Sequence, residues 1–377
     1  MKNRILSLCV ALLAVSCTAD SARIDTFPFG RTSDGQEVTK YRLTSPLGSY
    51  IEVLDYGGHI VGIYVPDRNG VLGDVALGYD TVDEYENPDN KLYIGALLGR
   101  YANRIETGVV EIDGRQAVLS PNETVKGHVN HIHGGYEGFN HKMWHAEPSI
   151  DGRTAVLTLT RISPDGEEGY PGNLACKVTY KWTPENVWRI EYEAETDRPT
   201  IVNMSQHCFF NLDGYGASVM DHTFMVDADS YSLNSEWYIP ESRESVEGTP
   251  FDFREPRVIG ERADMPSLQL ERMGGYSAGW YLNGYDGTLR KVAKLSGAAS
   301  GRTVEVSTTE PCLLIYTGRW LSESVRGKYG ALYPYAGMIL ETIHHPNTPR
   351  NPELPQCTLR PNEKYRSVTE YRFGIAD

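Results

Sequence analysis

Apolar and polar residues alternate along several segments of the chain. In residues 174–182 (LACKVTYKW) and 187–195 (VWRIEYEAE), every second side chain is apolar or aromatic, and most of the side chains between them are polar. A period of two is typical of antiparallel strands that bury one face. Residues 155–162 (AVLTLTRI) and 303–309 (TVEVSTT) are predicted to be further strands, whereas a short helix is expected near residues 256–261.

Glycine and proline interrupt the chain throughout, with 37 and 21 residues respectively. We find no long amphipathic helix, no internal repeat and no low-complexity linker that would divide the chain. Many short strands separated by turn residues favour an all-β protein. We therefore expect one large antiparallel β-sandwich over residues 25–377, because large β-sandwiches often form a single domain.

The N-terminal sequence MKNRILSLCVALLAVSC has the composition of an export signal. Two basic residues precede an apolar stretch that is too short to act as a membrane-spanning helix. Ala-Val-Ser-Cys at residues 14–17 resembles a bacterial lipobox, with Ala14 where leucine is commoner. An ordinary signal peptide that is cleaved near Cys17 is the alternative.

We predict a lipoprotein-type signal peptide over residues 1–16, a lipid anchor on Cys17 and a tether over residues 17–24. The protein is then exported and is either periplasmic or anchored to the outer membrane. No other apolar run could be a membrane span, so this anchor is the only membrane contact that we expect.

The charge of the chain argues against polyanionic partners. The net charge is −14, and removal of residues 1–16, which contain two basic and no acidic residues, changes it to −16. Nucleic acids and anionic membrane surfaces repel such a protein. A neutral small molecule is unaffected by this argument.

Four cysteines remain in the mature chain, and they are widely spaced with no CxxC pair. Cys176 and Cys312 lie in strand-like patterns, where buried free thiols are common. An even number of cysteines in an exported protein also permits disulfides. We predict no particular disulfide and no metal–thiolate site.

Histidine is concentrated between residues 128 and 145, where five of the ten histidines lie. His131 and His133 could share one strand face, but no acidic or cysteine ligand accompanies them at a usual spacing. The sequence ETIHH (341–345) has ExxH spacing, although the strand-like residues before it and Pro346 after it argue against a helix. We expect no metal site.

A few polar residues lie in apolar or glycine-rich surroundings. They are Asn103 and Arg104 in GALLGRYANRIETG, His133 in HIHGG, His207 in SQHCFFN and Glu341 in GMILETIHH. Each one alone could be structural. Glu341 is the least ordinary, because a carboxylate that follows an apolar strand is costly unless it is paired or functional.

Six motifs in order along the chain resemble the aldose 1-epimerase (galactose mutarotase) family. They are GRYANRI (99–105), HGGYEGFNHKMW (133–144), SPDGEEGYPG (163–172), HCFFNLDG (207–214), YTGRWL (316–321) and YPYAGMILET (333–342). The resemblance implies a galactose mutarotase-like supersandwich with an open sugar-binding cleft and no cofactor. It also implies an isomerase that opens and recloses a sugar ring by acid–base catalysis.

The resemblance implies a role for each matching residue. His207 would donate a proton to the ring oxygen, and Glu341 would accept the proton of the C1 hydroxyl. With reference pKa values of about 4.3 and 6.5, Glu is expected to be ionised at neutral pH, and His is able to carry a proton. The positions that match sugar contacts are Asn103, Arg104, His133 and Phe209.

The chain departs from the family pattern at several positions. In GGYSAGW (274–280), Ser277 stands where the family usually has Asp. Leu314, Arg319 and Ile343 replace the expected Gln, Asn and Gln. We therefore expect an altered substrate preference and a wider cleft, in which Trp280 stacks on a second sugar ring.

Two alternatives to a mutarotase remain. The first is a carbohydrate-binding lipoprotein that has lost turnover. The second is a phosphosugar epimerase on a related fold, for which Arg104 and Arg319 supply few cations.

Overall fold

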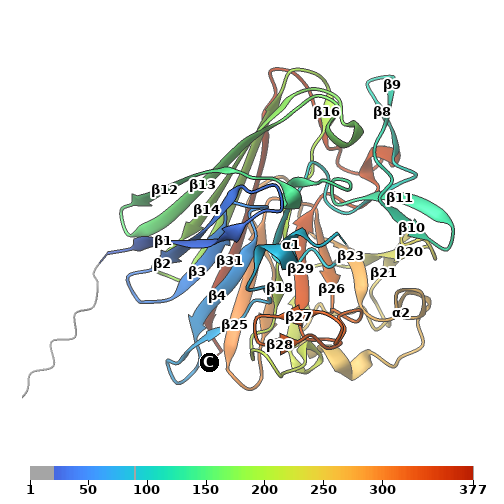
Figure 1. Ribbon diagram of the computed structural model, residues 1–377. Coiled ribbons are helices and arrows are strands. Elements are labelled where there is room, and N and C mark those ends of the chain that lie inside the picture. The colour runs from blue at the N-terminus through green and yellow to red at the C-terminus, as the bar shows by residue number, and fades with distance from the viewer. Residues whose placement is uncertain (1–20, 89–90, 377) are drawn as a thin grey trace, which may run out of the picture.

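Antiparallel β-strands make up most of the structure, a computed structural model that describes residues 21–88 and 91–376 (Figure 1). The predicted signal peptide and Cys17 lie outside the described residues. The helices are short, and the all-β prediction is confirmed. None of the helices in the described ranges has the length and apolar character that a bilayer crossing requires.

The largest sheet has nine strands, all paired antiparallel. In spatial order they are β12 (His145–Asp151), β13 (Thr154–Ser163), β14 (Leu174–Trp182), β15 (Val187–Thr196), β31 (Tyr365–Ile375), β25 (Arg302–Thr308), β24 (Arg290–Ser296), β19 (Thr223–Val226) and β22 (Arg257–Val258).

The four strands predicted from alternation are confirmed as β13, β14, β15 and β25. Their apolar positions are the buried ones, as in Leu174, Cys176 and Val178 of β14. The helix expected near residues 256–261 is wrong in type. Strand β22 occupies its first half, and a single 3-10 turn, η4 (Ile259–Arg262), follows.

A six-stranded sheet faces the nine-stranded sheet, and a five-stranded sheet lies beside both (Figure 1). The six strands are, in spatial order, β18 (Phe209–Phe210), β29 (Met338–Ile343), β26 (Cys312–Tyr316), β23 (Ser277–Tyr281), β20 (Ser230–Asn234) and β21 (Pro240–Ser245). The five are β1 (Arg23–Arg31), β2 (Glu37–Thr44), β3 (Tyr50–Leu54), β4 (Ile60–Pro66) and β5 (Leu72–Asp74).

Smaller sheets and helices complete the fold. The small sheets are β10 (Glu123–Val125) with β11 (His128–Ile132) and β7 (Arg104–Glu106), β17 (Ser205–His207) with β6 (Ala96–Leu98), β16 (Thr200–Ile201) with β30 (Thr358–Leu359), β8 (Val109–Ile112) with β9 (Arg115–Val118), and β27 (Arg326–Gly327) with β28 (Gly330–Ala331). The helical segments are α1 (Val82–Glu86), α2 (Leu268–Met273), η1 (Phe139–His141), η2 (Glu167–Gly169), η3 (Val219–Asp221) and η5 (Thr348–Arg350).

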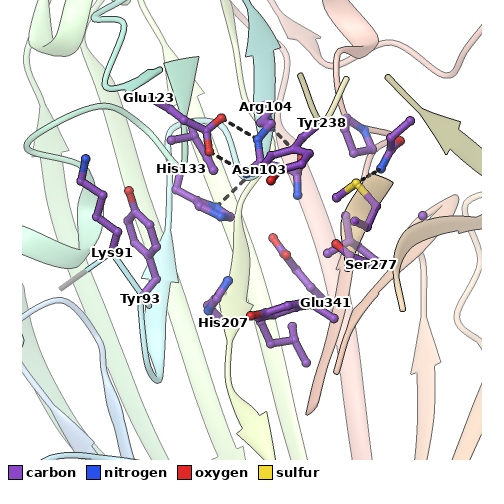
Figure 2. A pocket seen from close by; sticks show the side chains of 18 of the residues that line it. Lys91, Tyr93, Asn103, Arg104, Glu123, His133, His207, Tyr238, Ser277 and Glu341 are labelled. Atoms are coloured by element: carbon purple, nitrogen blue, oxygen red, sulfur yellow. Dashed lines mark hydrogen bonds and ion pairs between the residues drawn. The ribbon is translucent and has the colours of Figure 1, made fainter. Parts of the chain in front are cut away.

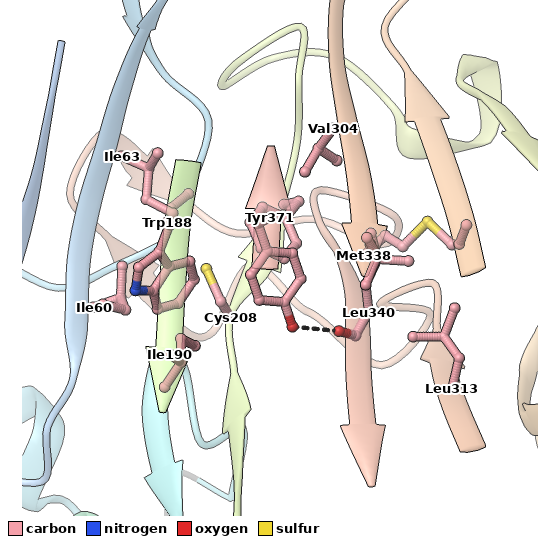
Figure 3. Close-up of a cluster of buried hydrophobic side chains, with 14 of the residues drawn as sticks. Ile60, Ile63, Trp188, Ile190, Cys208, Val304, Leu313, Met338, Leu340 and Tyr371 are labelled. Atoms are coloured by element: carbon pink, nitrogen blue, oxygen red, sulfur yellow. Dashed lines mark hydrogen bonds between the residues drawn. The ribbon is translucent and has the colours of Figure 1, made fainter. Parts of the chain in front are cut away.

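Side chains of the nine-stranded, six-stranded and five-stranded sheets together form the main core (Figure 3). Trp188 of β15 and Tyr371 of β31 stack with ring centroids 5.1 Å apart. The Tyr371 hydroxyl donates a hydrogen bond to the backbone oxygen of Leu340 in β29 at 2.7 Å. Apolar burial therefore holds the sheets together, and this buried hydrogen bond fixes one point of contact between the nine-stranded and six-stranded sheets.

The six-stranded sheet has two different faces because side chains alternate along each strand. In β29, Met338 and Leu340 belong to the core, whereas Ile339 and Glu341 line a cavity on the opposite face. The predicted sandwich is therefore confirmed, and the face of this sheet that is turned away from the core carries polar chemistry.

Buried Arg100 joins two of the sequence motifs. Its guanidinium donates to the carbonyl oxygens of Ser163, Pro164, Pro171 and Gly172 at 2.8–3.1 Å, and its Nε donates to Ser163 Oγ at 2.7 Å. A buried guanidinium without acceptors would be costly, and these oxygens provide the acceptors for Arg100. The arginine of GRYANRI thus holds the loop SPDGEEGYPG.

All four cysteines of the described chain are buried free thiols. Cys176 and Cys312 lie in strands β14 and β26, in agreement with the strand-like patterns around them.

Candidate active site

A cavity of about 210 Å³ lies on the exposed face of the six-stranded sheet. Its wall is completed by the loops around β6, β7 and β11. The cavity brings together every site residue predicted from the sequence: Asn103, Arg104, His133, His207, Phe209, Ser277 and Glu341. Figure 2 shows His207 and Glu341 in its lower half, across from Asn103 and Arg104.

Glu341 is a fully buried carboxyl group with no partner. Its exposed fraction is 0%, and neither carboxyl oxygen has a hydrogen bond to any residue that the structure describes. Burial raises the pKa of Glu341 to about 8, although the positive charge of Arg104 acts in the opposite direction. A buried polar group without a partner is costly, so this carboxyl has unused capacity to bind or to move a proton.

His207 ends β17 and is enclosed by aromatic rings. The rings of His133, Phe209 and Tyr93 lie 5.1, 5.4 and 5.9 Å from its imidazole, each edge-on. Burial lowers the pKa of His207 to about 3, against the opposing effect of the Tyr93 backbone. The Tyr93 backbone favours the protonated form of the imidazole. Within the described residues, however, His207 Nδ1 has no hydrogen-bond partner.

Burial shifts these two pKa values in opposite directions, because it disfavours both charged forms. The shifts favour a protonated carboxyl on Glu341 and an unprotonated imidazole on His207 at neutral pH.

Asn103 and His133 both have unusual backbone conformations. Their φ angles are 65° and 50°, in the left-handed region that non-glycine residues seldom adopt. The Asn103 backbone N–H donates to His133 Nδ1 at 3.2 Å. Burial holds the pKa of His133 well below its usual range. Because Nδ1 of this neutral ring is an acceptor, its proton is on Nε2, which leaves one donor available.

Arg104 is held by a carboxylate that sequence reasoning missed. Its Nε and one terminal nitrogen donate to the two oxygens of Glu123, both at 2.6 Å, and Asn130 donates to the same carboxylate at 3.0 Å. The guanidinium also lies 5.2 Å from the ring centroid of Tyr238. Glu123 therefore neutralises Arg104 and fixes its orientation. No local motif joins the two residues, which meet because β7 and β10 pair with the same strand, β11.

Comparison with known proteins identifies this arrangement. A family model described as Aldose 1-epimerase matches residues 39–372. The chain belongs to the aldose 1-epimerase family.

Individual relatives agree with this membership. The galactose mutarotase of Homo sapiens is 35% identical over 347 residues, which cover 91% of this chain and 96% of that protein. The aldose 1-epimerase of Escherichia coli (strain K12) is 34% identical over 343 residues, with 90% and 96% covered. The crystal structure of a galactose 1-epimerase from Lactobacillus acidophilus NCFM has a TM-score of 0.81 and 26% identity, and covers 95% of this chain and 100% of its own.

The family, the fold class and the isomerase class predicted from the sequence are confirmed. Aldose 1-epimerases interconvert the anomers of a sugar, and these relatives give no support to a non-catalytic binding protein. The phosphosugar alternative also lacks support, because Glu123 neutralises Arg104 and the Arg319 guanidinium lies over Trp320, 5.7 Å from its ring centroid.

The expectation that Trp280 stacks on a second sugar ring is wrong. Trp280 is fully buried in the core, and its indole N–H donates to the Phe251 carbonyl at 3.2 Å. Alternation along β23 explains this, because Ser277 and Gly279 line the cavity whereas Ala278 and Trp280 face the core. The tryptophan that does line the cavity is Trp320, which is 59% exposed.

The histidines considered as metal ligands have other partners. His131 interacts through Nδ1 with the Ser120 carbonyl at 2.7 Å and through Nε2 with the Tyr170 hydroxyl at 2.5 Å. His133 lies beyond the end of β11 in the turn described above. Within the described part of the chain, no three His, Cys, Asp or Glu side chains form a metal-binding group.

Replacing Glu341 by Gln is expected to stabilise the ligand-free protein more strongly as pH rises. The unfolded carboxyl ionises near its ordinary pKa of 4.5, whereas the folded one stays protonated up to about pH 8. The contribution of Glu341 to the free energy of unfolding is therefore fully present below pH 4.5 and decreases between there and pH 8, by at most about 1.4 kcal/mol per pH unit. Glutamine has no such loss, so urea unfolding should show a larger gain at pH 8 than at pH 5.

Glu310 provides a matched control, because it is also buried but accepts a hydrogen bond from His344 at 2.7 Å. Burial opposes it, yet the charge and hydrogen bond of His344 lower the pKa of Glu310. Glu310→Gln should therefore destabilise the protein at neutral pH. A gain for Glu341→Gln that is the same at pH 5 and pH 8 would contradict the assignment of a raised pKa.

Proposed function

We propose that the protein interconverts the anomers of a neutral sugar, with His207 and Glu341 as the proton-transfer pair. The observation that carries the proposal is the unpartnered Glu341 carboxyl, which lies in the same cavity as His207. The names of the relatives, galactose mutarotase and aldose 1-epimerase, support the reaction type.

The reaction needs two proton transfers at one hemiacetal carbon. Glu341 accepts the proton of the C1 hydroxyl while His207 donates a proton to the ring oxygen. The bond between C1 and the ring oxygen breaks, and the C1 oxygen becomes the carbonyl of a free aldehyde. After the aldehyde turns, the ring oxygen attacks its other face and both protons return. A positioned acid or base typically contributes about 10²–10⁴ in rate.

The pair carries the one proton that this scheme requires, but substrate must move it from Glu341 to His207. The empty cavity gives neither carboxyl oxygen of Glu341 a hydrogen bond. Sugar hydroxyls that donate to these oxygens would favour the carboxylate, in the same direction as the charge of Arg104. Substrate binding would thereby supply the protonation states that the proposed roles require.

The other predicted residues fit the recognition of a sugar. His133 offers its Nε2–H, and the Asn103 side chain lines the same wall. Arg104, which Glu123 holds in place, offers donors in a fixed direction. Phe209 gives a sugar ring an apolar surface beside His207. None of these groups requires a metal or an organic cofactor.

We also propose that the substrate preference differs from that of ordinary family members. Ser277 and Leu314 line the cavity at positions where the family usually has Asp and Gln. A carboxylate and an amide that could hydrogen-bond sugar hydroxyls are thus replaced by a short hydroxyl group and an apolar side chain.

The proposed location is outside the cytoplasm. The composition of residues 1–16 supports an export signal, and Cys17 follows the small residues of a lipobox-like sequence. In this proposal residues 17–24 tether the single catalytic domain over residues 25–377 to a membrane of the cell envelope. Strand β1 begins at Arg23 and Ala22 is buried in the core, so the last three residues of the proposed tether already belong to the folded domain.

His207→Asn and Glu341→Gln should each lower kcat by about 10²-fold or more, with smaller effects on sugar binding. Each substitution removes one proton-transfer group but keeps a polar side chain of similar size. Polarimetry of freshly dissolved sugars measures the rate. Near-wild-type mutarotation by either folded variant would refute the assigned roles.

The double variant Ser277→Asp/Leu314→Gln should gain about tenfold or more in kcat/KM for galactose and glucose. A charge-assisted hydrogen bond contributes about 1.5–3 kcal/mol, and about 1.4 kcal/mol corresponds to a factor of ten. The difference should appear against the unmodified protein in the same polarimetric assay. A folded double variant with no gain would mean that the replaced groups do not limit the use of these sugars.

Cells that express the protein should incorporate a radioactive fatty acid into it through Cys17. The comparison is with Cys17→Ser, which removes the thiol but keeps the apolar segment before it. Labelling of the wild-type protein alone is expected. Equal labelling of both proteins contradicts the anchor, and an unlabelled secreted product would favour the ordinary signal peptide.

A further inference from the structure

Asn234 is a buried polar residue of the cavity that the proposed mechanism does not use. It is 7% exposed. Within the described residues its Oδ1 has no hydrogen-bond partner, and its Nδ2 donates to Met273 Sδ at 3.9 Å. A thioether sulfur is a weak acceptor. Buried side-chain amides nearly always have partners. Asn234 therefore resembles Glu341, which lines the same cavity and also lacks partners.

The fold places Asn234 beside Ser277. Strands β20 and β23 pair at Ser230–Tyr281 and Tyr231–Trp280, and beyond these pairs the Gly279 backbone N–H donates to Ser232 Oγ at 3.0 Å. Gln269 of α2 bridges the two strands there, because its Oε1 accepts from the Asn234 backbone N–H and its Nε2 donates to the Ser277 carbonyl, both at 2.7 Å. This buried amide fixes the separation of the two residues.

The position of Asn234 beside Ser277 indicates what kind of group it can bind. Ser277 stands where a carboxylate is usual in the family, and the shorter serine leaves space at this wall of the cavity. The side-chain oxygen of Asn234, on the neighbouring strand, offers an acceptor in the same part of the cavity. This acceptor is neutral, so it suits an N–H or O–H donor.

We propose that Asn234 is a specificity-determining residue that accepts a hydrogen bond from a hydroxyl or N-acylamino substituent of a neutral sugar. The proposal rests on the proposed mutarotase function. A neutral sugar suits this cavity better than one with a carboxylate or phosphate substituent, because Glu123 already neutralises Arg104.

The test combines a protein variant with changes to the sugar. Wild type and Asn234→Leu are assayed for kcat/KM on glucose, on the 2-, 3-, 4- and 6-deoxy derivatives of glucose and on N-acetylglucosamine, all freshly dissolved. If the recognised group is a hydroxyl, one deoxy sugar should be about tenfold worse than glucose for the wild type and equal to glucose for the variant. If it is an N-acylamino group, the wild type should prefer N-acetylglucosamine about tenfold, and the variant should lose that preference.

Two further variants separate recognition from a structural effect. Asn234→Asp keeps the shape and an acceptor oxygen, so it should keep the discrimination that Asn234→Leu loses. Leu233→Met alters the adjacent residue of β20, which points to the other side of the strand, and should leave all ratios unchanged. If the leucine variant does not fold, Asn234→Ala provides the same comparison.

An equal loss on every sugar, or no loss on any, by a folded Asn234→Leu or Asn234→Ala protein would overturn the proposal. Failure of the proposed mutarotase function gives a different result, because the wild type would then accelerate the mutarotation of no sugar at all.

Discussion

The two-sided character of the six-stranded sheet is the constraint on which the site depends. One face packs on the nine-stranded sheet, so Met338 and Leu340 of β29 are committed to the core. Alternation then places Ile339 and Glu341 on the other face, where they line the cavity. Because neighbouring strands keep their register, Leu314 of β26 pairs with Glu341 on one side and with Gly279 of β23 on the other. The packing of the core thus fixes the position of the Glu341 backbone in the wall of the cavity.

This arrangement has an energetic cost that function explains. A carboxyl without hydrogen bonds in a buried position lowers stability relative to a neutral or paired group. The fold provides partners for comparable groups elsewhere, since His344 pairs with Glu310 and Lys328 pairs with buried Asp74. The absence of such a partner for Glu341 among the described residues is therefore a property of the site. In the proposed mechanism the sugar is the partner of this carboxyl.

Much of the fold could be predicted because alternation is a local pattern. Strands β13, β14, β15 and β25 follow directly from it. The motif residues of the site also come together as expected. Arg100 explains why two of the motifs occur in the same protein, because its buried hydrogen bonds join GRYANRI to the loop 163–172. Motifs of this kind contain both residues that hold the site in place and residues that line the cavity. The sequence alone does not distinguish the two kinds.

The incorrect or missing predictions concern features that arise only when distant strands meet. The small residues before Trp280 predict that its side chain lines the cavity. Because side chains alternate along β23, Trp280 lies in the core instead. No sequence motif marks Glu123 or Asn234 as cavity residues. Each lies on a different strand from the cavity residue beside it, which is Arg104 for Glu123 and Ser277 for Asn234. The protonation of Glu341 and His207 depends on burial, which is a tertiary property.

The central claim is that the Glu341 carboxyl is protonated when the cavity is empty and ionised when a sugar occupies it. Carbon-13 NMR of the protein with labelled glutamate side chains, assigned by comparison with Glu341→Gln, can follow this one carboxyl through a pH titration. The account predicts a pKa of about 8 for the free protein and a lower value with sugar bound. A carboxyl that titrates at its ordinary pKa in the free protein, and does not change when sugar is added, would contradict it.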